Sequence, residues 1–225
     1  MSLTARNALI SLGITVVLVG TVVFTVNYLN RARIAELATI EDQISIDALS
    51  LDTQFSLLAA APCDSSATTT TLTSELGDLG SRLAYTESQL GNDNEQVIRL
   101  KEKYSLLEIR DYLITKQLAA ACGTKPPVTV LYFYSNSEAC PDCEKAGYAL
   151  SYLRSTYPSL RVYSFDYSIN LGALKTLISV LKIKDQLPAF LVNGKRVYGY
   201  TSLEDLESQF PKGALSTSTA SLKSL

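Results

Sequence analysis

The chain has 225 residues, a formal net charge of -2 at pH 7 and no histidine. Because the charge is near zero and no basic stripe runs along a predicted helix, we expect no nucleic-acid partner. Without histidine the chain lacks the commonest general base and a common zinc ligand, which excludes serine and cysteine hydrolases of the usual kind. The length allows one or two domains.

The first predicted element is an apolar helix. Residues 7–30 carry no charge and lie between Arg6 and Arg31. A helix over roughly 22 of these residues rises about 33 Å, which is enough to cross a hydrocarbon core of about 30 Å. A signal peptide would have a shorter apolar run of about 7–15 residues and a small-residue cleavage site, which the following residues do not offer. The sequence therefore predicts an uncleaved single-pass anchor within 1–30, crossing the membrane through residues 8–29.

Two signals for the orientation in the membrane disagree. One basic residue, Arg6, precedes the apolar run, whereas Arg31 and Arg33 follow it, and this excess favours a cytoplasmic C-terminal part. The four cysteines favour an oxidising compartment, because disulfides persist there. We give the cysteines more weight and expect a protein of the cell membrane whose soluble part is extracytoplasmic.

Helical periodicity dominates residues 31–122, where three apolar stripes follow one another. The stripes are Leu37, Ile44, Leu51 and Leu58; Leu72, Leu76, Leu79, Leu83 and Leu90; and Val97, Leu100, Tyr104, Leu107, Ile114 and Leu118. The first stripe stops at Pro62, and the turn formers of 91–94 separate the second from the third. If the helix breaks at 91–94, the region is an up-down-up bundle; if it does not, the region is a long hairpin. A coiled coil that forms a homodimer through the same stripes is the third interpretation.

Cys63 and Cys122 bear on this choice. Cys63 follows the first stripe and Cys122 ends the third, so only the broken, up-down-up arrangement brings both to one end of the bundle. A disulfide needs a Cα separation of about 4.4–6.8 Å, far less than a hairpin would leave. We expect a structural disulfide between the two residues. A relay pair, free thiols and bonds between chains are the alternatives.

From residue 123 the pattern changes to that of an α/β domain over 123–212, with the order β-α-β-α-β-β-α. The predicted elements are a strand at 128–135, a helix after Cys143, a strand at 160–167, a helix at 171–183, two strands around the Asn193-Gly194 turn and a helix at 202–210. Residues 213–225 are rich in serine and threonine, and we expect a flexible tail.

Cys140 and Cys143 form a C-x-x-C pair between the first strand and the following helix. A thiol at a helix N-terminus faces unpaired N–H groups and the positive end of the helix dipole, both of which favour the thiolate. With Pro141 at the first helical position, Cys140 is the predicted attacking and more exposed sulfur, and Cys143 resolves the mixed disulfide. A zinc site would also require Cys63 and Cys122. We expect no metal and no cofactor beyond the cysteines.

The strand, the C-P-x-C at a helix start and the Leu187-Pro188 pair before a hairpin resemble the thioredoxin superfamily, in the element order of glutaredoxins, over about 128–210. The resemblance implies a thioredoxin-like fold and thiol–disulfide oxidoreductase activity. It also implies that Pro188 is a cis-proline that faces Cys140 and Cys143, with the preceding backbone available to a substrate strand.

Several residues depart from the family patterns. Tyr134 stands where thioredoxins carry a buried aspartate and Ala139 where they carry tryptophan, while Tyr198-Gly199 and Ser202 replace the glycine pair and aspartate of glutaredoxins. The last two changes favour a protein dithiol or disulfide over glutathione as the substrate. Glu138 and Asp142 oppose thiolate formation and predict a comparatively reducing couple.

The sequence thus predicts a membrane-anchored thiol–disulfide oxidoreductase that acts on protein dithiols or disulfides, or with a redox partner protein. The alternative is a non-catalytic interaction protein. In that case the helical region binds partners or dimerises, and the thioredoxin-like domain is only a scaffold.

Overall fold

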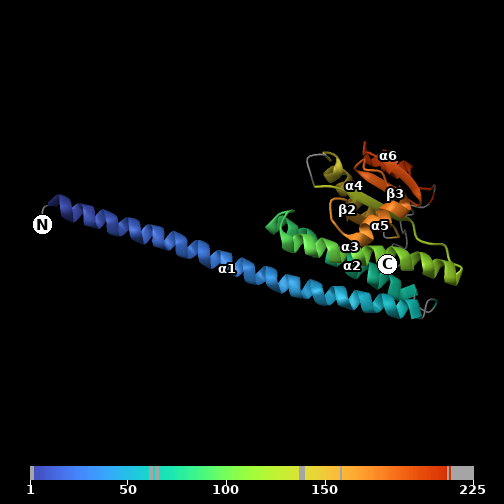
Figure 1. Ribbon diagram of the computed structural model, residues 1–225, viewed down its shortest axis with the longest axis horizontal. Coiled ribbons are helices and arrows are strands. Elements are labelled where there is room, and N and C mark those ends of the chain that lie inside the picture. The colour runs from blue at the N-terminus through green and yellow to red at the C-terminus, as the bar shows by residue number, and fades with distance from the viewer. Residues whose placement is uncertain are drawn as a thin grey trace, which may run out of the picture. The chain divides into compact units, whose positions relative to one another are not determined.

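The computed structural model describes residues 3–60, 63, 66–136, 140–157, 159–211 and 213 (Figure 1). The chain divides into two compact units, Met1–Ile46 and Asp47–Leu225. The boundaries expected from sequence lay elsewhere, at 30 and 122. The second expected boundary falls inside one unit because the helix that ends there packs on the sheet that follows. The predicted tail lies outside the described residues, apart from residue 213.

The first unit holds the greater part of α1, a helix that spans Leu3–Ala60. Its segment Leu12–Arg31 has 20 residues and a mean hydropathy of 2.0, and it has no buried side chains. Thr21 and Thr25 donate their hydroxyl hydrogens to the carbonyls of Leu18 and Thr21, both at 2.8 Å, so these polar groups are satisfied within the helix. By length and composition this segment can cross a membrane, although a signal sequence near the N-terminus meets the same criterion.

In the second unit the helix breaks between α2, Ser66–Leu90, and α3, Glu95–Cys122. Gly91 adopts a φ of 87°, and the Asn94 side chain accepts a hydrogen bond from the N–H of Gln96 at 2.9 Å, which caps α3. Gly123 ends α3 with a φ of 62°. The three helical segments are therefore those of the broken alternative and not of a long hairpin.

The apolar stripes of these helices are mostly buried within the chain. The buried members are Leu51, Phe55 and Leu58 on α1, Leu76, Leu79 and Leu83 on α2, and Val97, Leu100, Leu107 and Ile114 on α3. A Cβ built on Gly80 would lie 2.6 Å from the Tyr104 hydroxyl oxygen, so α2 and α3 approach each other closely at this glycine. These side chains form an intramolecular core.

A disulfide joins Cys63 to Cys122 at the end of α3, with a Cα separation of 5.6 Å and a sequence separation of 59. It closes a loop that contains both α2 and α3. In the chain-entropy description such a bond acts mainly by restricting the unfolded chain.

Replacing both Cys63 and Cys122 by serine is expected to lower the free energy of unfolding by about 2–4 kcal/mol, because the unfolded chain regains the freedom of this loop. The measurement is denaturant unfolding of the protein under non-reducing conditions. Equal stability of the wild-type protein and the double variant would contradict the prediction.

The C-terminal part of the second unit forms one mixed sheet in the strand order β2-β1-β3-β4, with β1 and β2 parallel and the other pairs antiparallel. The strands are β1 Thr129–Tyr134, β2 Arg161–Asp166, β3 Ala189–Val192 and β4 Lys195–Tyr198, and the helices are α4 Cys143–Thr156, α5 Gly172–Leu181 and α6 Leu203–Ser208. This is the predicted order β-α-β-α-β-β-α.

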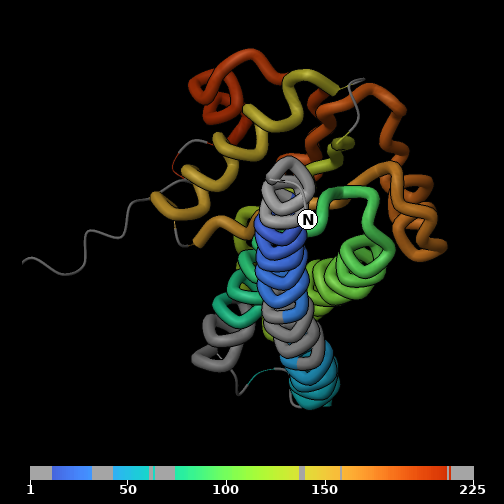
Figure 2. The backbone as a smooth tube through the Cα atoms, turned by 90° about the vertical axis from the view of Figure 1, so that its left-hand side faces the viewer, coloured from blue at the N-terminus to red at the C-terminus, as the bar shows by residue number. Residues whose placement is uncertain are grey.

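Each face of the sheet has its own core, and α4 and α5 lie on opposite sides of it (Figure 2). Successive residues of β1 alternate between the cores: Val130 and Tyr132 pack with α4 and α6, whereas Leu131 and Phe133 pack with α5. Tyr112 of α3 belongs to the second of these cores. The helix α3 and the sheet therefore share the core that also contains α5.

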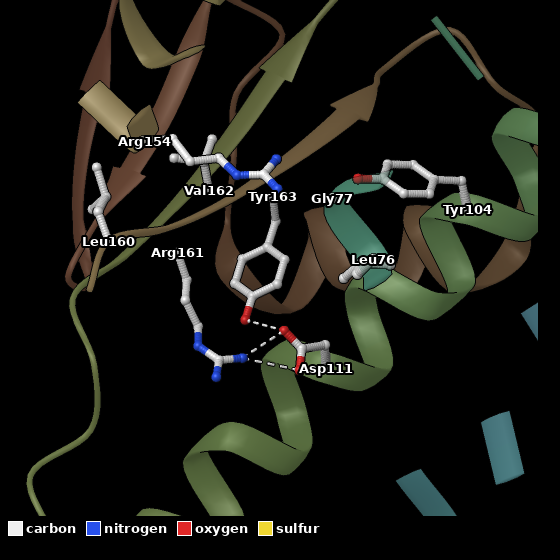
Figure 3. A pocket seen from close by; sticks show the side chains of 9 residues that line it. All are labelled: Leu76, Gly77, Tyr104, Asp111, Arg154, Leu160, Arg161, Val162 and Tyr163. Atoms are coloured by element: carbon white, nitrogen blue, oxygen red, sulfur yellow. Dashed lines mark hydrogen bonds and ion pairs between the residues drawn. The ribbon is translucent and has the colours of Figure 1, made fainter. Parts of the chain in front are cut away.

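Polar contacts also join α3 to β2 (Figure 3). The Arg161 guanidinium donates to both carboxylate oxygens of Asp111, at 3.0 and 2.9 Å, and the Tyr163 hydroxyl donates to the same carboxylate at 2.8 Å. Thr115 accepts a further bond from Arg161 at 3.2 Å. All four residues are buried, so the carboxylate and the guanidinium satisfy each other away from water.

One turn away, Glu108 of α3 is also buried against β2. It accepts a hydrogen bond from the backbone N–H of Ser164 at 3.0 Å, which satisfies a donor of an edge strand. Its second oxygen has no hydrogen-bond partner among the described residues. Burial raises the pKa of Glu108 well above its ordinary value of 4.5, and the hydrogen bond from Ser164 opposes this only in part.

Because the pKa of Glu108 is raised on folding, its contribution to stability is complete below about pH 4.5 and is lost as the pH rises through the folded-state pKa. Glu108→Gln keeps an oxygen for the Ser164 N–H and does not titrate. The wild-type protein is therefore expected to lose stability relative to Glu108→Gln as the pH rises from about 4.5. Thermal unfolding of both proteins across a pH series measures this, and parallel curves would refute it.

Candidate redox site

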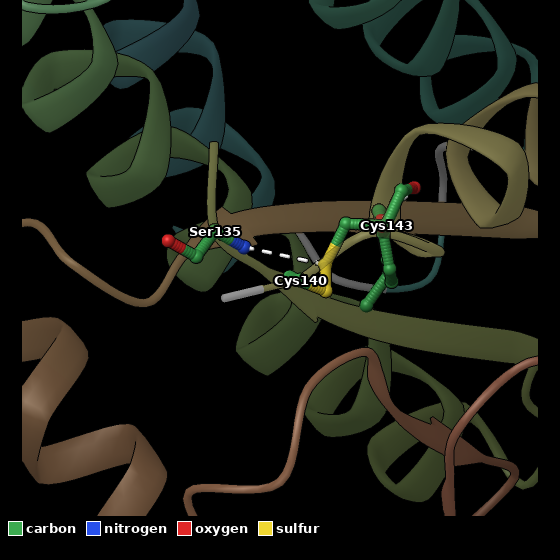
Figure 4. Close-up of a disulfide and its surroundings, with 4 residues drawn as sticks. Ser135, Cys140 and Cys143 are labelled. Carbon is green, nitrogen blue, oxygen red and sulfur yellow. Dashed lines mark hydrogen bonds between the residues drawn. A yellow bond between two sulfur atoms is a disulfide. The ribbon is translucent and has the colours of Figure 1, made fainter. Parts of the chain in front are cut away.

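Cys140 and Cys143 are joined by a disulfide, with a Cα separation of 5.4 Å (Figure 4). The helix α4 begins at Cys143 rather than at Pro141 as expected, and Asp142 is its N-cap. The N–H of Cys143 bonds the Cys140 carbonyl three residues earlier, at 3.2 Å, so a tight turn precedes the regular helix. The first helical position therefore belongs to Cys143, and Cys140 lies just before the helix.

The two cysteines are almost equally buried. The exposed fractions are 6% for Cys140 and 4% for Cys143, so the predicted greater exposure of Cys140 is not present in the disulfide form. The backbone N–H of Ser135 points at the Cys143 sulfur at 3.5 Å (Figure 4), and the Tyr132 hydroxyl donates to the Cys143 carbonyl at 2.5 Å. Burial raises the pKa of Tyr132, which keeps its hydroxyl protonated as a donor.

Pro188 lies at the end of the sheet that also carries the cysteine loop. The Leu187-Pro188 peptide bond is cis, Pro188 is buried, and its carbonyl accepts the N–H of Gly199 at 2.8 Å. The next residue, Ala189, pairs with Phe133 near the end of β1. Ser135, whose N–H contacts the Cys143 sulfur, lies two residues beyond Phe133. The sheet register thus brings Pro188 and the cysteine pair to one end of the sheet.

The residues that depart from the family patterns have identifiable surroundings. Tyr134 is largely buried, and burial together with the nearby carboxylates Asp166, Glu87 and Glu108 raises its pKa well above 10.0, so it is neutral. Asp142 forms an ion pair with Lys145 at 3.0 Å, which offsets the negative charge expected beside Cys140. Glu138 and Ala139 lie outside the described residues.

At the end of β4 and just after it, the two substitutions of the glutaredoxin pattern have structural roles. The Tyr198 hydroxyl accepts a bond from the Lys184 N–H at 3.2 Å, and the Ser202 hydroxyl oxygen accepts the Asp205 N–H at 3.1 Å, which caps α6. Gly199 between them adopts a φ of 79°.

A buried ion-pair array beside the cysteine loop was not predicted from the sequence. Lys101 of α3 has only 4% of its side chain exposed and pairs with Glu87 of α2 at 2.5 Å and with Asp166 of β2 at 3.1 Å. Asn136, in the loop after β1, donates from its amide to the same Glu87 at 2.9 Å. The helical region therefore contacts the cysteine loop directly.

The sequence does contain a signal for this array. Polar residues recur on α3 at helical spacing alongside the apolar stripe, and the structure buries them; they are Lys101, Ser105, Glu108, Asp111 and Thr115. A second, polar stripe next to an apolar one indicates a helix face packed against a polar partner surface.

The two disulfides lie at opposite ends of α3. Asn136 of the cysteine loop bonds Glu87, which is paired with Lys101 near the start of α3, whereas Cys122 ends the helix. The helix between residues 101 and 122 rises roughly 30 Å at about 1.5 Å per residue. Direct exchange between the pairs within one such chain is incompatible with this separation, which argues against the relay alternative.

A groove of about 660 Å³ opens beside the cysteine loop. Ser135 and Asn136 line one side of it, and Asn92, Asp93 and Glu102 of the α2–α3 corner line another. Among the described residues no group of three or more His, Cys, Asp or Glu side chains could hold a metal ion.

The chain is similar to two solved structures of plant thioredoxins. Thioredoxin O1 from Arabidopsis thaliana, in its oxidised state, is 25% identical at a TM-score of 0.31, over 37% of this chain and 78% of that protein. Thioredoxin O2 from the same plant, also oxidised, is 23% identical at a TM-score of 0.30, over 36% of this chain and 70% of that protein. No family model and no curated protein sequence matches. The strand order and the helices on both faces of the sheet are those of a thioredoxin-like fold.

Proposed function

We propose that this chain is a membrane-anchored thiol–disulfide oxidoreductase that exchanges disulfides with protein substrates through Cys140 and Cys143. One observation carries the proposal: a C-x-x-C disulfide at the entrance to α4 lies at the same end of the sheet as the cis Leu187-Pro188 peptide. A disulfide between residues three apart in a tight turn can open and close with little rearrangement of the chain.

The reaction is a pair of sulfur exchanges. In the reducing direction the Cys140 thiolate attacks one sulfur of a substrate disulfide, forming a bond to it and releasing the other sulfur as a thiolate that takes up a proton. The Cys143 thiolate then attacks the Cys140 sulfur, which re-forms the Cys140–Cys143 bond and releases the second substrate thiolate. The substrate gains two electrons and the cysteine pair loses two. The opposite direction runs through the same mixed disulfide.

Two observations support a protein rather than glutathione as the substrate. The Tyr198 hydroxyl bonds the Lys184 backbone, and Ser202 caps α6, so both serve the fold at positions where glutaredoxins have a small residue and a carboxylate. A polypeptide substrate does not require that carboxylate.

The location is part of the same proposal. The segment Leu12–Arg31 is long and apolar enough to anchor the chain in a membrane. The Cys63–Cys122 disulfide supports an oxidising compartment for the soluble part, because such bonds are rare in the reducing cytosol. We therefore place the soluble part on the extracytoplasmic side of the cell membrane.

A second candidate is a non-catalytic interaction protein, and the burial of both redox cysteines favours it. Only 6% of Cys140 and 4% of Cys143 is exposed, which limits the access of a substrate to either residue, whereas a scaffold needs no such access.

The test is a thiol count on the full chain in its native membrane. Mild treatment with a reduced protein dithiol should expose two thiols, those of Cys140 and Cys143, and an added protein disulfide should remove them again. Cys63 and Cys122 should stay protected until the protein is unfolded. If the Cys140–Cys143 bond exchanges with neither reagent, the chain is not an oxidoreductase and the scaffold candidate stands.

A further inference from the structure

We propose that Asn136 is a positioning residue for Cys143, held in place by Glu87 of the helical region. This inference rests on the proposed redox function, since it concerns how the resolving sulfur is prepared for exchange. The inference means that residues of α2 and α3, outside the thioredoxin-like domain, contribute to the redox site.

The contacts form a continuous path from α3 to the sulfur. Lys101 fixes the Glu87 carboxylate at 2.5 Å, and one oxygen of that carboxylate accepts the Asn136 amide at 2.9 Å. Asn136 follows Ser135 directly, and the Ser135 N–H points at the Cys143 sulfur at 3.5 Å. β1 holds the chain on one side of that N–H, and the Asn136 amide holds it on the other.

The array that holds Asn136 is rigid for a physical reason. Lys101 is buried and bonds both Glu87 and Asp166, and the second oxygen of Asp166 accepts the N–H and the hydroxyl of Ser168, at 3.1 and 2.5 Å. Buried charged groups that satisfy one another in this way keep a single geometry, because any displacement leaves a charge unpaired away from water. Glu87 itself is half-buried, with 21% of its side chain exposed, and its pairing with the buried Lys101 restrains it as an acceptor for Asn136.

The Ser135 N–H matters most after the disulfide opens. A thiolate at Cys143 is a stronger acceptor than a disulfide sulfur, so an N–H held beside it favours the thiolate and with it the attack that releases substrate. A loop that is free to move would hold this donor less well. The array should then lower the pKa of the Cys143 thiol by fixing the donor.

Other charged or titratable groups around the loop oppose or balance this effect. Asp142 and Lys145 of α4 form an ion pair, and Tyr132 and Tyr134 of β1 are neutral because burial raises their pKa values. Glu144 follows Cys143 on α4, where Tyr148 donates to it at 3.1 Å. The array adds two carboxylates against one ammonium group. The net negative charge of the array alone would raise the pKa of the Cys143 thiol. Holding the Ser135 N–H in place would lower this pKa, so the two effects oppose each other.

The test measures the pKa of the Cys143 thiol in the full chain carrying Cys140→Ser, with the Cys63–Cys122 bond intact so that only one thiol can react. The readout is the rate of alkylation of Cys143 against pH, followed by mass spectrometry. Adding Asn136→Ala is expected to raise that pKa by about half a unit to one unit. Adding Asn92→Ala, which changes another asparagine lining the same groove, is expected to leave it unchanged.

A third variant, Glu87→Gln, keeps an oxygen acceptor for Asn136 and removes the charge, so the Cys143 pKa should stay at or below that of the parent. Equal pKa values with and without Asn136→Ala would overturn the proposal, as would a shift with Glu87→Gln in the absence of one with Asn136→Ala. These outcomes do not depend on enzymatic activity. A failure of the redox function would appear in the thiol count, and a failure of the positioning role would appear here.

Discussion

Replacing Cys140 by serine is expected to reduce disulfide exchange by at least about a thousandfold, because the variant loses the attacking sulfur and keeps only the buried Cys143 thiol. Cys143→Ser should behave differently. It keeps the attacking sulfur and loses the one that releases the substrate, so the mixed disulfide at Cys140 should accumulate. The measurements are reduction of the insulin interchain disulfides and, for Cys143→Ser, capture of substrate proteins that a reductant releases.

The control is the double variant Cys63→Ser/Cys122→Ser, assayed at a temperature at which it remains folded. It should keep exchange close to the wild-type rate, because these residues lie at the far end of α3 from the cysteine loop. Loss of exchange in this folded variant would show that the second pair takes part in the reaction. Insulin reduction by Cys140→Ser at the wild-type rate would remove the assigned role of Cys140.

Replacing Arg161 by alanine is expected to lower the free energy of unfolding by about 3–5 kcal/mol, because it leaves the buried Asp111 carboxylate without its cation. Asp111 is 3% exposed, and its remaining partner there, Tyr163, is a neutral donor (Figure 3). Burial tends to lower the pKa of Arg161, but Asp111 and the Tyr163 interaction raise it on balance, so the guanidinium is charged. Denaturant unfolding of the purified protein measures the loss.

The matched control is Arg99→Ala, on the exposed side of α3, the helix that carries Asp111; there Arg99 and Glu95 are paired at 3.6 Å. This change is expected to cost less than about 1 kcal/mol, because water screens an exposed pair and both side chains lose conformational freedom in forming it. A cost for Arg161→Ala as small as that of Arg99→Ala would contradict a buried ion pair. The double variant Arg161→Ala/Asp111→Ala should be more stable than Arg161→Ala, because it also removes the buried carboxylate that has lost its cation.

Features that depend on neighbouring residues could be predicted from the sequence. The helix break at 91–94 follows from Gly91 and the Asn94 cap, and the β3–β4 hairpin follows from Asn193 and Gly194, which adopt φ values of 47° and 90°. The order of strands and helices from 128 onwards follows from the change of apolar period. Each of these signals depends on a few consecutive residues and not on tertiary contacts, so it can be recognised in the sequence alone.

The start of α4 shows the limit of local reasoning even within the C-x-x-C. Pro141 suits a first helical position, yet the helix begins at Cys143, because the Cys143 N–H bonds Cys140 in a tight turn that the disulfide spans. The preference of one residue for the first helical position therefore does not fix where the helix begins.

The apolar N-terminal helix, the turn formers at 91–94 and the C-x-x-C at the junction of a strand and a helix could all be recognised in the sequence, although a continuous helical hairpin remained an alternative. The three-dimensional structure was needed to show that α3 shares a core with the sheet, that Arg161 and Asp111 pair across 50 residues, and that Glu87 bonds both Lys101 and Asn136 of the cysteine loop. From sequence alone, a charged residue on a helix is expected to be exposed to water, because its buried partner is not known. The buried partners of these residues come from strands and loops far along the chain, and their pairing is fixed by packing rather than by spacing.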